Sequence, residues 1–253
     1  MNRLRIPRAL TIAGSDSSGG AGVQADLKTF SALDVYGLTV LTAVTAQNTV
    51  EVKDYLELPP DLVKAQIEAI IEDVGIDSAK TGMLSSPAIV EVVAEAVKKY
   101  GFPLVVDPVM AAKSGMPLLR PEAIETLKEK LLPISTLVTP NRLEAETLAS
   151  MKISSIDDAR KAAKTIVEEF GVKAALVKGG HLDDSEAVDV LYAEGRFFEF
   201  RSPRIKTRNL HGTGCSFSAA IAAWLARGEP LVQAVAKAKE FITLAIRCGL
   251  PLG

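Results

Sequence analysis

The sequence contains little cysteine and little histidine. Its two cysteines, Cys215 and Cys248, and its two histidines, His181 and His211, have spacings that match neither a zinc cluster nor a disulfide framework. We therefore expect no structural zinc site and no disulfide bonds. This usage is consistent with a protein of the reducing cytoplasm.

Long apolar runs and clusters of one charge are also missing. No apolar stretch reaches the length of a membrane span, and residues 1–8 lead directly into a short strand-like run instead of a signal peptide. The 29 basic and 31 acidic residues nearly cancel, and no Lys/Arg cluster is dense enough to bind a phosphate backbone. We expect a cytoplasmic protein with a small-molecule ligand, without a nucleic-acid or membrane partner.

Short β-branched runs alternate with longer segments of helical period along the 253 residues. This alternation predicts an α/β fold, a three-layer α/β/α sandwich with a mainly parallel central sheet. The predicted strands are 9–13, 39–45, 52–56, 78–81, 104–107, 137–139 and 174–177. The predicted helices are 22–33, 60–72, 86–100, 121–131, 142–149, 156–170, 211–227 and 231–248. Two further strands, 188–192 and 196–200, flank Glu194-Gly195 and predict an antiparallel edge hairpin. No linker divides the chain, so we expect one domain, residues 1–253.

The strongest local signal is the turn Gly212-Thr213-Gly214-Cys215, which leads directly into an alanine-rich helix. Glycines allow close approach of a ligand, and the unpaired N–H groups and dipole of a helix start attract an anion. The same position favours the thiolate of Cys215, which would then accept a proton from an alcohol. Alone, the motif is equally typical of an ordinary helix start with a buried cysteine.

Three further polar groups follow predicted strands. Asp107 ends one strand, Asn141 and Glu144 follow the next, and Lys178 directly follows a third. Because ligands of open α/β sheets bind beyond the carboxyl ends of strands, these residues are placed to meet a magnesium ion or phosphates. Taken singly, Asp107 is more typical of a cap, and Asn141 with Glu144 is more typical of a helix capping box.

The segment from Gly14 to Gly22 is rich in glycine, but it matches neither a Walker P-loop nor the dinucleotide fingerprint. It is more typical of a loop that shapes a substrate pocket. Asp26 follows one turn into the next helix, where it is placed to hydrogen-bond a substrate or to interact with the helix dipole. The amide of Gln47 suits a ring with an amino group beside a ring nitrogen. Met83 suits a ring face or simple packing.

Together, these motifs resemble the ribokinase-like superfamily, and within it the hydroxymethylpyrimidine/phosphomethylpyrimidine kinases of thiamine biosynthesis. The resemblance extends over nearly the whole chain, and several ordered motifs are far more specific than one. The segments that carry it are 12–22, 42–49, 107–115, 139–146, 177–181 and 212–216. It implies a ribokinase-like fold, a homodimer, and the use of ATP with Mg²⁺ to phosphorylate hydroxymethylpyrimidine and then its monophosphate.

The resemblance also implies a role for each candidate residue. Gly212, Thr213 and Gly214 would form the anion hole, and Cys215 would be the base. Asp107, Asn141 and Glu144 would position magnesium, directly or through water, with Asp107 and Glu144 as the carboxylates. Lys178 would lie along the ATP phosphates, and residues 110–115 would form a flap. The substrate pocket would consist of Gly14, Ala21, Asp26, Val44, Gln47, Met83 and Val109.

Two alternatives remain open at this point. A pyridoxal or pyridoxine kinase would act on a similar heteroaromatic alcohol. A non-catalytic protein that senses the pyrimidine on the same scaffold is the second alternative, because a fold does not establish an activity. The chain stops at Gly253, where many relatives continue, and this makes the second phosphorylation the less secure of the two expected steps.

Overall fold

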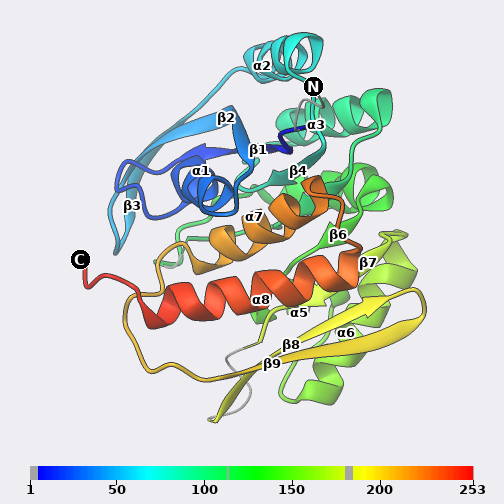
Figure 1. The fold of residues 1–253 in the computed structure, drawn as a ribbon. Helices are drawn as coiled ribbons and strands as arrows, with labels where there is room; N and C mark the ends of the chain where they lie inside the picture. The colour runs from blue at the N-terminus through cyan, green and yellow to red at the C-terminus, as the bar shows by residue number, and fades with distance from the viewer. Residues whose placement is uncertain (1–4, 113, 180–184, 253) are drawn as a thin grey trace.

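The computed structural model describes residues 5–112, 114–179 and 185–252. Within these residues, nine strands form one sheet in the order β3-β2-β1-β4-β5-β6-β7-β8-β9 (Figure 1). The strands are β1 (Arg8–Ser15), β2 (Tyr36–Gln47), β3 (Val52–Glu57), β4 (Ser78–Thr81), β5 (Leu104–Val106), β6 (Leu137–Val138), β7 (Ala174–Val177), β8 (Glu186–Ala193) and β9 (Arg196–Pro203). The strands from β2 to β7 in this order are parallel, so their carboxyl ends lie at one edge of the sheet.

The sheet has an antiparallel edge on each side. The predicted hairpin is confirmed as β8 and β9, which pair around a turn in which Glu194 and Gly195 both have positive φ. On the other side, β3 pairs antiparallel with β2, which the sequence did not predict. The connection from Gln47 to Val52 is too short for the crossover that a parallel pair requires, so β3 folds back on β2.

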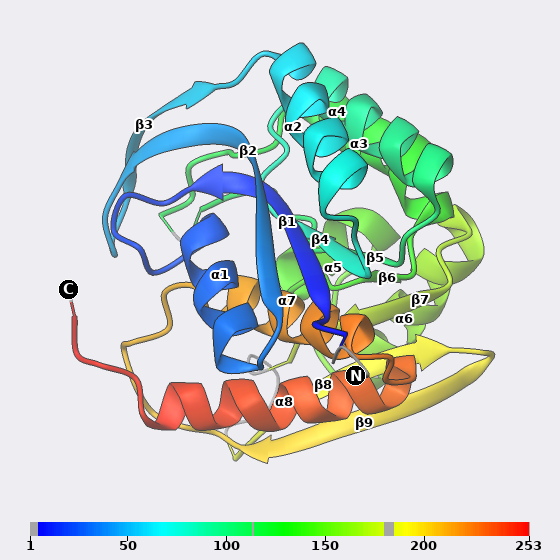
Figure 2. The same cartoon turned by 45° about the horizontal axis from the view of Figure 1, so that its top comes forward.

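Helices cover both faces of the sheet, which confirms the predicted three-layer sandwich (Figure 2). One face is covered by α1 (Gly22–Ala32), α7 (Thr213–Ala226) and α8 (Leu231–Arg247). The other is covered by α2 (Pro60–Asp73), α3 (Pro87–Tyr100), α4 (Pro121–Thr126), α5 (Arg142–Ala149) and α6 (Ile156–Phe170). In the part of the chain that the structure describes, no helix combines the length and the apolar character needed to cross a membrane.

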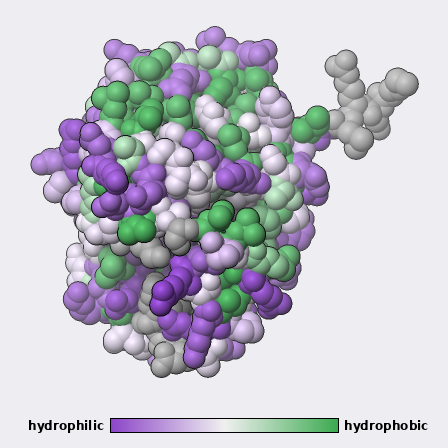
Figure 3. Space-filling view, turned by 90° about the vertical axis from the view of Figure 1, so that its left-hand side faces the viewer, coloured by the Kyte–Doolittle hydropathy of each residue, from purple (hydrophilic) through white to green (hydrophobic). Residues whose placement is uncertain are grey.

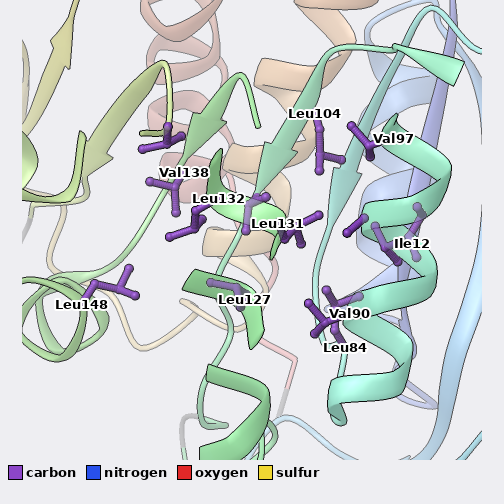
Figure 4. Packing of buried hydrophobic residues seen from close by; sticks show 14 of the residues in the cluster. Ile12, Leu84, Val90, Val97, Leu104, Leu127, Leu131, Leu132, Val138 and Leu148 are labelled. Carbon is purple, nitrogen blue, oxygen red and sulfur yellow. The ribbon is translucent and has the colours of Figure 1, made fainter. Parts of the chain in front are cut away.

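Alternating residues of the central strands contribute to two cores. Leu104 and Val106 of β5 pack with α3 and α4, whereas Val105 between them packs with α7 and α8. Figure 4 shows part of the first core, where Val97 and Leu131 lie near Leu104. Because both faces are buried, the strands are almost continuously apolar, and polar residues are concentrated where the strands end.

One predicted helix, 121–131, differs from the structure. The α-helix ends at Thr126 and continues as a π-helical turn over Leu127–Leu131 and a 3₁₀ turn over Leu132–Ile134. Pro133 has no N–H to continue a regular helix. The altered winding still buries Leu127, Leu131 and Leu132 in the core. The apolar side chains therefore face the core as predicted, although the backbone hydrogen bonds are not those of a regular α-helix.

Candidate active site

Two adjoining hollows lie at the edge where the parallel strands end. Figure 3 faces this edge, over which hydrophilic and hydrophobic side chains are interspersed. The larger hollow has a volume of ≈ 1570 Å³ and the smaller one ≈ 220 Å³. The two share part of their walls, namely Ala111, Ala112, Asn141, Glu144, Lys178, Leu210, Thr213 and Gly214. The structure thus brings the predicted phosphate-binding residues together at the junction of a large and a small binding space.

Lys178 and Asp107 form an ion pair at this junction. Lys178 Nζ donates to Asp107 Oδ1 at 2.8 Å, and the two side chains are 13% and 3% exposed. Burial alone would lower the pKa of Lys178, but the carboxylates of Asp107 and Glu144 outweigh burial and raise it. Lys178 is therefore a permanent cation beside the start of α7, where a Cβ built on Gly214 would lie 3.4 Å from its Nζ.

Asn141 and Glu144 form the predicted capping box and also lie on the walls of the hollows. They form a capping box at the start of α5: Glu144 N donates to Asn141 Oδ1 at 3.0 Å, and Asn141 N donates to Glu144 Oε2 at 2.8 Å. Both residues also line the two hollows. Burial raises the pKa of Glu144 to about 7, against the opposing charge of Lys178. The capping contacts of Glu144 therefore leave its carboxylate on the wall of the hollows, and its role toward magnesium stays a prediction.

Asp107 and Glu144 fit a magnesium ion that brings other ligands with it. Among the described residues, no group of three or more His, Cys, Asp or Glu side chains is arranged to hold a metal. Mg²⁺ is commonly held by one or two carboxylates together with water and substrate phosphates, not by a complete protein cage. The carboxylates of Asp107 and Glu144, both on the wall of the smaller hollow, match that requirement.

The start of α7 lies at the same junction. Gly212 is the N-cap residue with φ 76°, and no side chain caps the helix. A Cβ on Gly212 would lie 1.7 Å from the carbonyl oxygen of Gly20, so only glycine fits there. Thr213 and Gly214 border both hollows, where the first-turn N–H groups of a helix can attract an anion, and the N–H of Thr213 donates to Leu210 O at 3.3 Å in the ligand-free protein.

Cys215 lies in the wall of the smaller hollow, but its predicted thiolate character is wrong for the ligand-free protein. Burial raises the pKa of the thiol to about 11, although Lys80 and a hydrogen bond from the N–H of Gly22 act in the opposite direction. The desolvation of the sulfur exceeds the field of the helix start. At neutral pH the residue is therefore a thiol.

Asp26 does not line either hollow, which corrects its predicted contact with the substrate. Its carboxylate is fully buried, 3.0 Å from Nζ of the fully buried Lys80, and accepts a hydrogen bond of 2.6 Å from Thr11 Oγ1. Burial raises the pKa of Asp26 against the charge of Lys80. The sequence analysis did not find Lys80, because Ser78 and Thr81 of the same strand are also polar and give no sign that the strand is buried.

Of the other predicted pocket residues, Val44 lies outside the smaller hollow and the rest lie on its wall. Val44 is 45% exposed and pairs with Leu56 on the outer side of β2. An irregular register between β1 and β2, with Ala13 opposite Leu41 and Ser15 opposite Val44, shifts the alternation by one residue. The residue that faces the smaller hollow is therefore Thr45. The wall does contain Gly14, Ala21, Gln47, Met83 and Val109.

Asp16 and His211 are among the wall residues to which the sequence analysis gave no role. Asp16 and His211 line the smaller hollow, with His211 Nε2 2.8 Å from Asp16 Oδ2. Residues 110, 111, 112, 114 and 115 of the predicted flap border the hollows. Lys113 of the flap, and Gly180 and His181 of the 177–181 motif, lie outside the described residues.

Comparison with known proteins identifies the family. The model of the phosphomethylpyrimidine kinase family matches residues 16–253. The chain belongs to this family. A hydroxymethylpyrimidine/phosphomethylpyrimidine kinase of Bacillus subtilis is 47% identical over 252 residues, which cover 99% of this chain and 93% of that protein. The match confirms the predicted resemblance.

Two further relatives show the range of proteins around the family. The thiamine biosynthesis bifunctional protein ThiED of Geobacter sulfurreducens is 48% identical over 99% of this chain, which corresponds to 52% of its own length. The crystal structure of an ADP complex of Bacillus subtilis pyridoxal kinase has a TM-score of 0.90 and 41% identity, and the match covers 98% of this chain and 95% of that one. Kinases for two different ring alcohols thus share this fold.

Proposed function

We propose that this chain transfers the γ-phosphoryl group of ATP to the hydroxymethyl oxygen of hydroxymethylpyrimidine, and then phosphorylates the monophosphate to the pyrophosphate for thiamine biosynthesis. The single observation that carries the proposal is the shared wall of the two hollows, which holds Asn141, Glu144, Lys178, Thr213 and Gly214. The larger hollow has room for a nucleotide and the smaller one for a single ring. A phosphoryl group transferred from a nucleotide in the larger hollow to a ring in the smaller one would pass beside these shared residues.

The residues of the wall would act by position and charge. The N–H groups of Thr213 and Gly214 would hold the transferring phosphoryl group, and Lys178 would neutralise its oxygens. Asp107 and Glu144 would hold Mg²⁺, with Asn141 beside them; the ion would supply further neutralisation of the phosphates. Phosphoryl transfer proceeds through a loose transition state, so pre-arranged charge is the main contribution that a protein makes.

The smaller hollow would hold the pyrimidine. Gln47 would recognise the ring edge with its amide, and Thr45 Oγ1, 3.2 Å from Gln47 Oε1, would fix the orientation of that amide. Gly14, Ala21, Met83 and Val109 would supply small and apolar walls. Only the thiolate form of Cys215, a small fraction near neutral pH because the pKa of the thiol is about 11, would take the proton of the hydroxymethyl group. It would do so late in the reaction, when the oxygen is already bonding to phosphorus and its proton has become acidic.

The experiment that tests this function is a mass-spectrometric time course. Purified protein is incubated with magnesium-ATP and hydroxymethylpyrimidine, with pyridoxine as a parallel competitor. We expect the monophosphate first and then the pyrophosphate. Monophosphate alone would remove the second step, and a preference for pyridoxine would move the chain to the vitamin B6 kinases. Tight binding of the pyrimidine without any product would identify a sensor.

Pyridoxal or pyridoxine phosphorylation is the second candidate function, and the pyridoxal kinase neighbour with 41% identity favours it. The 47% identical relative and the family model are named for the pyrimidine, so the pyrimidine is our first candidate for the substrate. The homodimer, the cytoplasmic location and the lack of a nucleic-acid partner stay predictions from sequence and resemblance.

A further inference from the structure

Two loops from opposite ends of the chain interlock at the smaller hollow. The first is the glycine loop, residues 16–22, which joins β1 to α1. The second is the α7 turn, residues 210–215. A Cβ on Gly20 would lie 2.5 Å from His211 Cδ2, and one on Gly212 would lie 1.7 Å from the oxygen of Gly20. The two loops therefore approach each other so closely that a side chain on either glycine would collide with the other loop.

Asp16 organises the glycine loop from within. Its side chain is 2% exposed, and its carboxylate accepts hydrogen bonds from Ser18 N at 2.8 Å and from Ala21 N at 2.7 Å. Ser18 Oγ adds contacts of 2.8 and 2.9 Å to the two oxygens. Burial alone would raise the pKa of Asp16, but the hydrogen bonds from His211, Ser18 and Ala21 outweigh it and hold the pKa below its usual value.

His211 connects this carboxylate to the α7 turn. Its Nε2 lies 2.8 Å from Asp16 Oδ2, and its ring is 18% exposed. Because an ionised carboxylate only accepts, we assign the Nε2 proton to His211 as donor. The next residue along the chain is Gly212, the N-cap of α7. This 2.8 Å hydrogen bond joins the glycine loop to the α7 turn, alongside a longer contact of 3.4 Å between Ser18 Oγ and His211 Nε2 and the hydrogen bond from Gly22 N–H to Cys215.

We propose that Asp16 and His211 form a positioning pair that holds the glycine loop and the α7 turn in register, so that the ring alcohol faces the transferring phosphoryl group. The proposal rests on the proposed kinase function and adds two residues to it. Neither residue borders the larger hollow, so the pair would act on the alcohol side of the reaction. Misplacement of reacting groups by about 1 Å can cost on the order of 10²-fold in rate, so one such contact is able to control turnover.

Steady-state kinetics of matched variants test the pair. His211→Leu removes the donor, and His211→Gln keeps an N–H donor at a similar reach. We expect His211→Leu to lower kcat by about 10- to 100-fold and to raise the KM of the alcohol, with the KM of ATP nearly unchanged. His211→Gln should recover most of the lost kcat. A His211→Gln enzyme as slow as His211→Leu would overturn the proposal, as would a loss confined to the KM of ATP.

Two further variants separate positioning from general damage to the loop. Asp16→Asn replaces the accepting oxygen by an amide, and a double-mutant cycle with His211→Leu should show strongly non-additive losses, because both changes break the same bond. The control is Lys28→Met, which removes a 2.7 Å hydrogen bond from Lys28 Nζ to Gly19 O but leaves the link to α7 intact. Additive losses in the double variant, or a loss of kcat in Lys28→Met equal to that in His211→Leu, would contradict the proposal.

The kinetic measurements use whichever ring alcohol the wild-type protein phosphorylates, so an incorrect substrate would not affect them. Amide hydrogen exchange gives a readout that does not depend on activity. In His211→Leu, peptides from both the glycine loop and the α7 turn should exchange faster, whereas in Lys28→Met only the glycine loop should do so. Unchanged exchange in the α7 turn of His211→Leu would show that the two loops are held together without the pair and would contradict the proposal.

Discussion

At the scale of single residues, the chemistry depends on groups whose charge is set by burial and by one or two neighbours. Lys178 keeps its charge because Asp107 and Glu144 outweigh its desolvation, whereas nothing comparable offsets the desolvation of Cys215. The α7 helix start therefore predicted where Thr213 and Gly214 lie, at the junction of the two hollows, but it was a poor predictor of a thiolate. A sequence pattern shows which residue follows a helix start, but not how much water its side chain loses on folding.

Cys215 provides the prediction at this scale. Cys215→Ala should lower kcat by about 10²-fold or more, in the range of general-base losses, while the Kd of the nucleotide stays unchanged, because Cys215 borders only the smaller hollow. Stopped-flow or coupled-assay kinetics measure kcat, and titration calorimetry measures the Kd. Since the thiol of the free protein has a pKa of about 11, wild-type kcat/KM should keep rising with pH above neutrality, and this slope should vanish in the variant.

Cys248→Ala is the matched control for that experiment. Cys248 is the only other cysteine of the chain and is exposed at the end of α8. We expect wild-type kinetics from it. Near-normal turnover of Cys215→Ala would instead remove the thiol from the mechanism and leave the reaction to charge and position alone.

At the scale of secondary-structure elements, the sequence predicted most of the strands and helices, because their apolar periods are strong. The failures occur where one element meets another. Because the register between β1 and β2 is irregular, Thr45 and not Val44 faces the smaller hollow. The antiparallel direction of β3 follows from the short connection between β2 and β3. Asp26 sits on the buried side of α1, against Lys80 of β4. Which side of a helix meets which strand is a property of the packed structure, and a single sequence does not contain it in readable form.

The Asp26–Lys80 pair gives the prediction at this scale, because it joins α1 to β4 inside the protein. Both side chains are fully buried, and removing one partner of a buried pair typically costs about 3–5 kcal/mol. Lys80→Met should therefore lower the free energy of unfolding by that amount. The double variant Lys80→Met/Asp26→Leu should recover a large part of it, because no unpaired charge remains.

Urea unfolding followed by circular dichroism measures these differences. The control is Lys53→Met in β3, where the lysine is exposed and the change should be small. A double variant no more stable than Lys80→Met would show that the cost comes from packing and not from the isolated charge of Asp26.

At the scale of the whole molecule, the site consists of contributions from strands, loops and helices that are far apart in the chain. Asp107, Glu144 and Lys178 come from successive connections of the parallel sheet, and the α7 turn closes the site from the other face. The sequence could predict this assembly because parallel strands bring their carboxyl ends to one edge. The resemblance placed Asp107 and Glu144 at one magnesium site, but the sequence could not predict that Glu144 is buried near the charge of Asp107, at a cost to the stability of the ligand-free protein.

That cost gives a prediction about stability and pH. Burial raises the pKa of Glu144 from its ordinary value of 4.5 to about 7, and Asp107 adds to the rise. Between these pH values the folded chain holds a proton that the unfolded chain has released. Stability contributed by the protonated group is therefore present below pH 4.5, falls as the pH rises toward 7, and is constant above that. Magnesium-ATP, which favours the ionised carboxylate, should offset the loss.

Thermal unfolding from pH 5 to pH 8 measures this effect. Glu144→Gln is neutral throughout, so the Tm of the wild-type protein should fall relative to that of Glu144→Gln as the pH rises. The control is Glu146→Gln on the same helix: hydrogen bonds from Ile153 N–H and Lys152 lower the pKa of Glu146, so its difference from wild type should stay constant across this range. The Tm increase caused by magnesium-ATP should be larger at pH 8 than at pH 5 for the wild type, because at pH 5 the ion must first displace the proton of Glu144. A wild-type Tm that tracks Glu144→Gln at every pH would mean that Glu144 is ionised in the free protein, and that its carboxylate is available to magnesium without any cost to the fold.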